Sequence, residues 1–476
     1  MFIAIAGNKM PFSLTNARIY MSEFIPPFPR RHKHQINPFQ ALYYAQNDLL
    51  SIWGEDAFTN EFMSQKILRQ HVFVANSPEI IRYVLVENKD NYERKSPQIK
   101  RALGPLLGDG LFISDGKTWS SRRKIQTPLF DSSHIQMYSK NMVSTITEMA
   151  GNWQKLDDGT SIEVHTEMAK LAAEIISRVL FGEKLGSENS AAVVGAFTDY
   201  QSVVKQMAIS NFLGLPDWMP NVNAKIGKAR VAAKTIHNAV DAIIAIAEKE
   251  NHKDTMVAEL IKANKSENGM DLMTREQIRN ELIVFFLAGH ETTANVLTWT
   301  WYLISQAPDV EKKLHQELDE VLAGRVPEYA DVENLKYTRA ILDETMRLYP
   351  PVPVLSRQAL KDDEIRGKKV PAGSIMLVVP WLIQRHKKFW KDPDHFIPER
   401  FMPGAEKPKK FTYIPFSVGP RVCIGKSFGI TESVLAIAII AQRFRLTLPP
   451  DTDVKHECRL TLRTKGKLPM TMHVRN

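Results

Sequence analysis

The stretch Phe416-Ser-Val-Gly419-Pro-Arg421-Val-Cys423-Ile-Gly425 decides what the rest of this chain has to build. It holds one of only two cysteines in the 476-residue sequence, and the apolar run behind it predicts a helix. The two glycines and the proline supply the conformations that a tight loop needs. A cysteine just before a helix N-terminus meets outward-pointing N–H groups and the positive end of the helix dipole, which favour a thiolate. We therefore expect a soft metal ligand at Cys423, the alternative being a small buried hydrophobe.

A second unusual stretch lies inside a long predicted helix. Thr274 and Gln277 have the spacing of a capping box, and no proline follows until Pro308, which predicts a helix of roughly 50 Å. Within it, Ala288-Gly289-His290-Glu291-Thr292-Thr293 places a glycine and two threonines where stronger helix formers are normal. Small residues let a flat cofactor approach the backbone, and a threonine hydroxyl bonded to the preceding turn opens the helix locally. The alternative is a kink beside a buried histidine, and we regard His290 as structural.

Two charged motifs precede the cysteine loop. Glu344-Thr-Met-Arg347 places a carboxylate and a guanidinium on one face of a predicted helix that stops at Pro350. Alone, such a pair is usually a solvated surface pair of little energetic weight. The later stretch Pro398-Glu-Arg400-Phe offers a second arginine to the same carboxylate.

Together these motifs resemble the cytochrome P450 superfamily over nearly the whole chain. The pattern Phe-x-x-Gly-x-Arg-x-Cys-x-Gly resembles its haem-binding loop, and Ala288–Thr293 resembles its oxygen-activation motif. The likeness is closest to the fatty-acid-hydroxylase and eukaryotic-like branch. It implies a mainly α fold with a small β region, the cytochrome P450 fold, around haem b (iron protoporphyrin IX). One departure is Gln384-Arg385-His386, where relatives usually show His-Arg, and it affects packing near the haem edge.

The resemblance also implies roles for individual residues. Cys423 would be the proximal ligand of the haem iron, Thr292 would donate a hydrogen bond to iron-bound dioxygen, and Glu291 would help to relay protons. A buried network, structural rather than catalytic, would fix the cysteine loop through Glu344, Arg347 and Arg400. Further haem contacts, including arginines suited to the propionates, would be Trp119, Arg123, Ala288, Arg357, Phe416, Arg421 and Gly425.

A substrate pocket is implied by the same resemblance. Phe112 ends Gly108-Asp-Gly-Leu-Phe112, a loop whose glycines suggest mobility, and the matching aromatic residue stands over the iron in fatty-acid-hydroxylating relatives. Ordinary core packing is the alternative for Phe112. The other implied substrate contacts are Leu287, Ala288, Val352, Val354 and Leu460, the last in a C-terminal hairpin expected around Lys465-Gly466. An apolar wall of this kind suits a fatty-acid-like, terpenoid or steroid substrate.

Composition limits the remaining possibilities. At 44% hydrophobic and 24% charged residues the chain has the composition of a soluble globular protein, and two cysteines fit a reducing, cytoplasmic compartment. The apolar start at residues 1–6 is far shorter than the about 20 residues of a membrane span, so we expect none. The sequence contains no basic stripe with aromatics, so we expect no nucleic-acid partner. We expect an N-terminal lead at residues 1–35 and one haem-binding monooxygenase domain at residues 36–476.

The expected reaction is monooxygenation, in which one atom of O2 enters an apolar substrate and the other leaves as water. With a net charge of +9 and basic residues expected on the cysteine side of the haem at Arg122, Lys124 and Lys426, we expect an acidic ferredoxin or flavin protein as electron donor. The Glu291-Thr292 pair argues against a peroxide-driven peroxygenase and against an isomerase or dehydratase of this fold. A haem sensor remains the alternative from another class.

Overall fold

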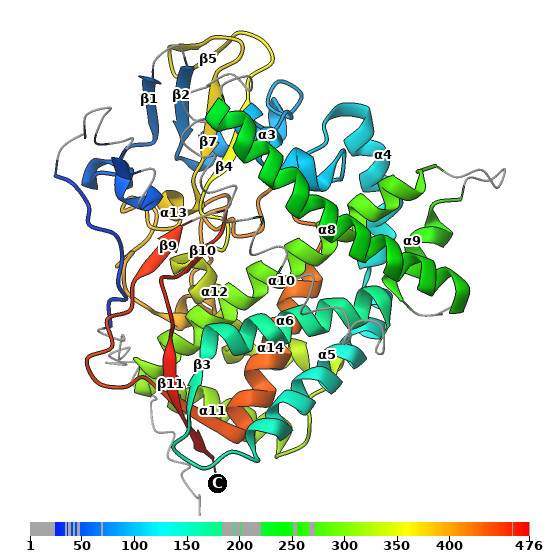
Figure 1. Ribbon diagram of the computed structural model, residues 1–476. Helices are drawn as coiled ribbons and strands as arrows, with labels where there is room; N and C mark the ends of the chain where they lie inside the picture. The colour runs from blue at the N-terminus through cyan, green and yellow to red at the C-terminus, as the bar shows by residue number, and fades with distance from the viewer. Residues whose placement is uncertain are drawn as a thin grey trace, which may run out of the picture.

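The computed structural model describes residues 24–33, 36, 40, 43–44, 48–67, 70–182, 195, 200, 220–250, 255–265, 272–458 and 460–475. The mainly helical architecture with a small β region that the sequence predicts is confirmed (Figure 1). The α-helices are α2 (Pro78–Arg82), α3 (Pro97–Leu107), α4 (Gly116–Gln126), α5 (Ser132–Trp153), α6 (Val164–Phe181), α8 (Pro220–Glu250), α9 (Met256–Ala263), α10 (Arg275–Ser305), α11 (Pro308–Leu322), α12 (Lys336–Leu348), α13 (Pro380–Ile383) and α14 (Lys426–Arg443). Shorter turns are η1 (Leu49–Ile52), η2 (Glu55–Phe58), η3 (Tyr83–Glu87), η4 (Thr127–Phe130), η5 (Tyr329–Glu333) and η6 (Pro398–Phe401).

The strands form small sheets at the margins of the helical body (Figure 1). A mixed sheet has the order β1 (Phe62–Ile67), β2 (Gln70–Ala75), β7 (Ile375–Val378) and β4 (Leu355–Gln358), and only β2 and β7 run parallel. A second sheet has the order β3 (Ser161–Glu163), β11 (Pro469–Val474) and β8 (Phe444–Thr447). Two strand pairs join β5 (Asp363–Ile365) to β6 (Lys368–Val370) and β9 (His456–Cys458) to β10 (Leu462–Thr464).

The C-terminal hairpin expected around Lys465-Gly466 is wrong. β10 pairs with β9, which precedes it, whereas β11 lies between β3 and β8. This central place lets β11 hydrogen-bond along both edges and bury Met470 and Met472 in the core. Leu460 and Thr461 therefore belong to the connection between β9 and β10.

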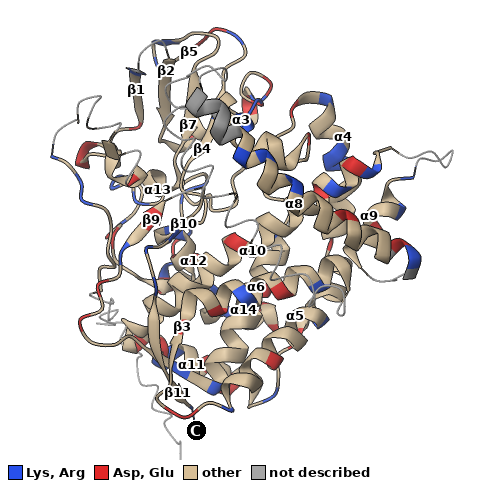
Figure 2. Ribbon diagram, viewed as in Figure 1, with Lys and Arg blue, Asp and Glu red and all other residues tan. Residues whose placement is uncertain are grey.

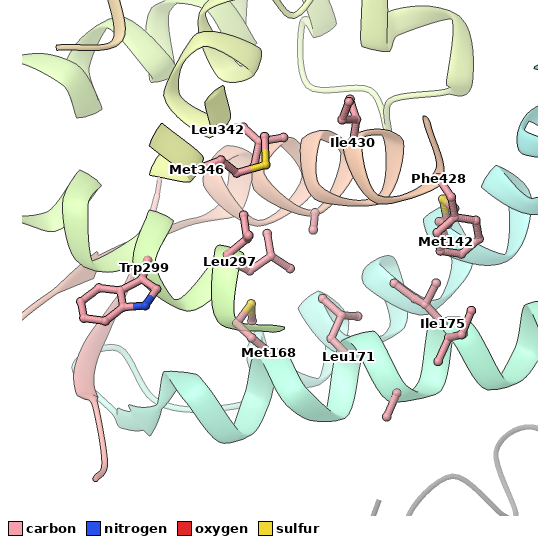
Figure 3. Close-up of a cluster of buried hydrophobic side chains, with 14 of the residues drawn as sticks. Met142, Met168, Leu171, Ile175, Leu297, Trp299, Leu342, Met346, Phe428 and Ile430 are labelled. Carbon is pink, nitrogen blue, oxygen red and sulfur yellow. The ribbon is translucent and has the colours of Figure 1, made fainter. Parts of the chain in front are cut away.

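Helix α10 runs through the middle of the molecule (Figure 1). The predicted capping box is confirmed, because the Thr274 hydroxyl accepts from the Gln277 N–H at 3.3 Å and the Gln277 side chain accepts from the Thr274 N–H at 2.9 Å. Figure 3 shows Leu297 and Trp299 of α10 among apolar side chains of α5, α6, α12 and α14. Burial of each such side chain contributes about 1.5–3 kcal/mol. Charged residues are sparse on α14 and on most of α10 (Figure 2), as burial of these helices requires.

The structure brings Glu344, Arg347 and Arg400 together. Arg347 donates through Nε and Nη2 to both oxygens of Glu344, at 2.6 and 2.7 Å, and neither side chain is exposed. Glu344 also accepts from the backbone N–H of Ile397 at 2.8 Å and from Nε of Arg400 at 3.3 Å. The remaining donors of Arg347 bond to carbonyls of the irregular segment 384–395. One buried pair on α12 thus holds a chain segment that has no regular structure of its own.

Gln384 extends this network toward the cysteine loop. Its amide nitrogen donates to the carbonyls of Met346 and Arg347, at 2.9 and 3.0 Å, and its oxygen accepts from the Ile414 N–H at 2.9 Å. The carbonyl of Ile414 in turn accepts from the N–H of Ser417, inside the loop. The fold therefore accommodates the departure noted at Gln384-Arg385-His386, because the amide nitrogen and the amide oxygen of Gln384 both form hydrogen bonds.

The described part of the N-terminal lead packs on the same region. Tyr349, next to α12, donates its hydroxyl to the carbonyl of Pro27 at 2.6 Å. Arg31 makes a two-pronged ion pair with Asp394, at 3.0 and 2.5 Å. Within the described ranges, none of the helices combines the length and apolarity needed to cross a membrane.

Substitution of Glu344 should be severe, because it leaves the buried charge of Arg347 without its partner. We expect Glu344→Ala to lower the free energy of unfolding by about 3–5 kcal/mol. Glu79→Ala is the control: Glu79 pairs with Lys409 at the surface, where such a pair contributes under about 1 kcal/mol. Denaturant unfolding of both variants measures the difference, and equal losses would contradict the role given to the buried pair.

Candidate functional site

The cysteine loop is closed by its own backbone. The N–H of Cys423 donates to the carbonyl of Phe416 at 2.9 Å, and that of Val422 donates to Gly419 at 3.0 Å. Gly419 has φ +75°, and a Cβ there would lie 2.2 Å from the carbonyl oxygen of Leu85. Only glycine fits this position, so the loop sits directly against the backbone of η3. Cys423 is thereby held three residues before Lys426, the first residue of α14.

The Cys423 side chain combines free surface with a desolvated environment. It is exposed, yet burial raises the pKa of its thiol, and this effect outweighs the Gly425 N–H and the charges of Arg123 and Lys426, which lower it. The donors expected from the sequence are present, but the expected net lowering of the pKa is wrong for the thiol in this surrounding. A side chain can be both accessible and desolvated when it borders an internal space of the protein. The sulfur is then available to a group bound within the fold.

Helix α4 and the loop bring three predicted haem contacts together. Arg123 donates from Nη1 to the carbonyl of Val422 at 2.9 Å, which joins α4 to the cysteine loop. The guanidinium of Arg421 lies 4.5 Å from the centre of the Trp119 ring and donates to the carbonyl of Ser114 at 2.9 Å. Trp119, Arg357 and Arg421 line one cleft.

Two arginines of this cleft, which Asp90 and Glu93 also line, interact with a neighbouring lysine, Lys95. Burial, then the charge of Arg421, lowers the pKa of Arg357 to about 10. Lys95, which sequence reasoning missed, has a pKa well below its usual value because of burial and the charges of Arg357 and Arg421. Asp115 acts against these shifts but also pairs with Lys100. A group with two carboxylates, such as haem, fits this set of cations. No local pattern marks Lys95, which precedes α3.

The distal stretch of α10 has two separate faces. The Thr292 hydroxyl donates to the carbonyl of Ala288 at 2.6 Å, the back-bond expected from the sequence, and Ala288 is exposed although most of α10 is buried. Glu291 accepts from the Thr461 hydroxyl at 2.7 Å. A Cβ on Gly289 would lie 3.1 Å from Ile176, so this glycine permits close packing of α10 on α6.

His290, on the same turn, is structural as expected. It is buried, and burial followed by the charge of His165 lowers the pKa of its imidazole to about 4. Its ring lies 5.9 Å from that of Phe286. The imidazole is therefore neutral and packs as a core side chain.

The implied pocket residues retain exposed surface. Phe112 is 42% exposed, which contradicts the core-packing alternative, and Lys95 Nζ lies 4.7 Å from the centre of its ring. The residues Leu287, Val352, Val354 and Leu460 are half-buried. The glycines before Phe112 do not mark mobility as expected. A Cβ on Gly108 would lie 2.2 Å from Asn280, and one on Gly110 would lie 2.9 Å from Val284, so both glycines let the loop pack closely on α10.

Arg122 does not lie on a docking surface, contrary to expectation. It is buried, with Nη2 2.8 Å from Asp109 and Nε 3.7 Å from Glu281, because this face of α4 packs toward α10. Lys124 and Lys426 are exposed. Arg122 thus fixes the loop before Phe112, since Glu281 also accepts from the Leu111 N–H.

Comparison with known proteins agrees with this geometry. The cytochrome P450 family profile matches residues 40–470. Cyclooctatin synthase of Streptomyces melanosporofaciens is 32% identical over 84% of this chain and 85% of its own length. Pentalenene oxygenase of Streptomyces avermitilis is 28% identical over 83% of this chain and 88% of its own. The crystal structure of the cytochrome P450DA heme domain has the same fold, with a TM-score of 0.80 at 24% identity, covering 95% of this chain and 98% of that one. This chain belongs to the cytochrome P450 family.

Proposed function

We propose that this cytochrome P450 holds haem b through Cys423 and inserts one oxygen atom from O2 into an apolar, terpenoid-like or fatty-acid-like small molecule. Haem as cofactor and monooxygenation as reaction follow from the family. The axial ligand, the roles of single residues and the substrate class are our proposals. The observation that carries them is the thiol of Cys423, exposed yet desolvated, on a loop joined to α4 and η3.

The residues around the cysteine loop fit two parts of a haem, the iron and the propionates. Haem supplies dioxygen activation, and a thiolate ligand favours cleavage of the O–O bond. Cys423 would be that ligand, with Phe416 and Gly425 beside it. Trp119, Arg357, Arg421 and Lys95 would bind the propionates, which balances the charge that these side chains bring together. Arg123 would fix the loop against α4.

We propose that Thr292 and Glu291 handle protons on the opposite side of the haem. Thr292 has a hydroxyl whose present acceptor is a carbonyl of its own helix, so it can hold a water or a polar ligand at little cost. Glu291 is an acid one residue away on α10, and its side chain is half-buried. The exposed side chain of Ala288 leaves room between them and the cofactor.

The proposed substrate class rests on the apolar pocket residues. Phe112, Leu287, Val352, Val354 and Leu460 offer no charge to a ligand, which favours an aliphatic or terpenoid-like molecule. The name pentalenene oxygenase is consistent with such a substrate in a relative. Orientation would then depend mainly on shape, and Phe112 has the largest side chain of the set.

For electron supply we propose an acidic ferredoxin or flavin protein that docks over the cysteine loop. Lys124 and Lys426 flank this loop and are exposed. We also propose a cytoplasmic, reducing location, because a chain of 476 residues with only two cysteines has no disulfide framework.

Replacing the proposed ligand should remove its spectroscopic signature. We expect Cys423→Ser to lose the Soret band that a carbon monoxide complex shows when a thiolate is the axial ligand. Cys458→Ser is the control, because Cys458 lies on β9 and burial raises its pKa to about 12. Retention of the band in Cys423→Ser, or its loss in Cys458→Ser, would overturn the assignment.

Phe112 should control where the substrate is oxidised. Since it is 42% exposed, Phe112→Ala should cost well under the about 3–5 kcal/mol of a core phenylalanine and should shift the product distribution along the substrate. Phe396→Ala, at a fully buried position, should show the larger stability loss. Product analysis and melting curves of both variants decide the matter. A large stability loss in Phe112→Ala with unchanged regiochemistry would refute the pocket assignment.

Reversal of charge beside the cysteine loop should slow electron transfer. We expect Lys426→Glu to lower the rate of haem reduction by an acidic donor, and the wild-type rate to fall as ionic strength rises. Lys312→Glu, on the exposed side of α11, is the matched control. Stopped-flow reduction measures both, and a salt-independent rate with equal effects of the two substitutions would point to another docking surface.

A further inference from the structure

The Glu291 carboxylate is bound to a distant part of the chain. Thr461, in the connection between β9 and β10, donates its hydroxyl to Glu291 Oε1 at 2.7 Å. Asn295, one turn along α10 from Glu291, donates Nδ2 to the same hydroxyl oxygen at 3.1 Å. Because an amide nitrogen can only donate, the Thr461 hydroxyl accepts from Asn295 and directs its own hydrogen at the carboxylate. Thr461 and Asn295 are 6% and 1% exposed, so the arrangement is a buried one.

The two polar groups of the proposed proton pair point to different partners. Thr292 donates to Ala288 within α10, whereas Glu291 bonds to the β9–β10 connection. Consecutive residues of a helix do not face each other, so the contact with Thr461 turns the carboxylate away from the Thr292 hydroxyl. In this orientation the Glu291 carboxylate cannot deliver a proton directly to a ligand bound at the Thr292 hydroxyl.

The same connection touches the proposed substrate pocket. Leu460 precedes Thr461 directly, and the N–H of Leu462, which follows it, donates to the carbonyl of Pro351 at 2.9 Å. Pro351 precedes Val352, another proposed pocket residue. A molecule that contacts Leu460 and Val352 therefore acts on both sides of Thr461. Three consecutive residues thus link the pocket wall, the Glu291 carboxylate and the chain before β4.

We propose that Thr461 is a positioning residue that holds the Glu291 carboxylate against the β9–β10 connection until substrate contact at Leu460 releases it. The proposal rests on the proposed role of Glu291 in proton delivery. Its consequence concerns uncoupled turnover, in which electrons reduce O2 without forming product. Without substrate, two electrons and two protons convert O2 to hydrogen peroxide, and a held carboxylate slows this reaction by supplying protons less readily.

The size of the effect follows from the strength of the contact. A hydrogen bond to a charged group changes the ratio of held to released carboxylate by about tenfold or more. We expect Thr461→Val, which keeps the shape and removes the donor, to raise NADH consumption without substrate by about tenfold. Thr461→Ser keeps a hydroxyl and should return consumption toward the wild-type level.

A control variant and a spectrum separate this role from loss of packing. Thr464→Val is the matched control, because Thr464 lies on β10, is 4% exposed, and its hydroxyl has no partner among the described residues. In the infrared spectrum of the carbon monoxide complex, substrate-free Thr461→Val should show the C–O stretch of substrate-bound wild type. Substrate-free Thr464→Val should show that of substrate-free wild type. If Thr461→Val matches Thr464→Val in both consumption and spectrum, the proposal is wrong.

Glu291→Gln distinguishes failure of this inference from failure of the proposed function. If Glu291 delivers protons, this variant lowers product formed per NADH and changes the solvent isotope effect. The double variant Thr461→Val/Glu291→Gln should then equal Glu291→Gln alone, because Thr461 acts through the carboxylate. Unchanged coupling in Glu291→Gln would refute the proton role. Altered coupling there, with additive effects in the double variant, would refute the positioning role of Thr461 alone.

Discussion

The buried pair between Glu344 and Arg347 is the constraint on which the cysteine side of the molecule depends. Neither side chain is exposed, and a buried charge without compensation costs several kcal/mol. Every further donor of Arg347 is satisfied by a carbonyl of the segment 384–395, and Glu344 takes the N–H of Ile397. This segment has little regular structure to stabilise it. The need to satisfy two buried charges therefore fixes the path of this segment. Gln384 connects the segment to the cysteine loop, because its side chain accepts from the N–H of Ile414 just before the loop.

A second group of charges lies beside the cysteine loop, and these charges have the same sign. Arg347 is balanced within the protein, whereas Lys95, Arg357 and Arg421 repel one another and share Asp115 with Lys100. Their pKa values fall because of burial and mutual repulsion, which means that folding places them together at a cost. An anionic cofactor removes this cost on binding and so stabilises the folded chain by mass action. As the proposed site for the haem propionates, the cluster lowers the stability of the unliganded protein, unlike the Glu344 network.

The sequence predicts those parts of the site that short motifs encode. The cysteine loop, the α10 capping box and the Thr292 back-bond depend on neighbours within a few residues, and the structure contains all three geometries. Features set by long-range packing were missed or misinterpreted. From the sequence alone Gly108 indicates a mobile loop, but in the structure it packs closely on Asn280. Arg122 has the sequence context of a surface cation, but in the structure it is buried near Glu281. Lys95 carries no motif, and its environment comes from β4 and the cysteine loop, which lie far along the chain. The C-terminal strands pair by sheet position, which local turn signals do not determine.

The contact between Thr461 and Glu291 belongs to this long-range class, since 170 positions separate the two residues. That separation matters for how the site works. An acid whose partner lay on its own helix would be governed by α10 alone, a helix in which 21 of 31 residues are buried. A partner on the short β9–β10 connection is held from two sides, by Asn295 of α10 and by the hydrogen bond between Leu462 and Pro351. The orientation of Glu291 thus depends on an element that also borders the proposed substrate pocket. Helix α10 fixes where the acid is, and the connection determines which way its carboxylate points.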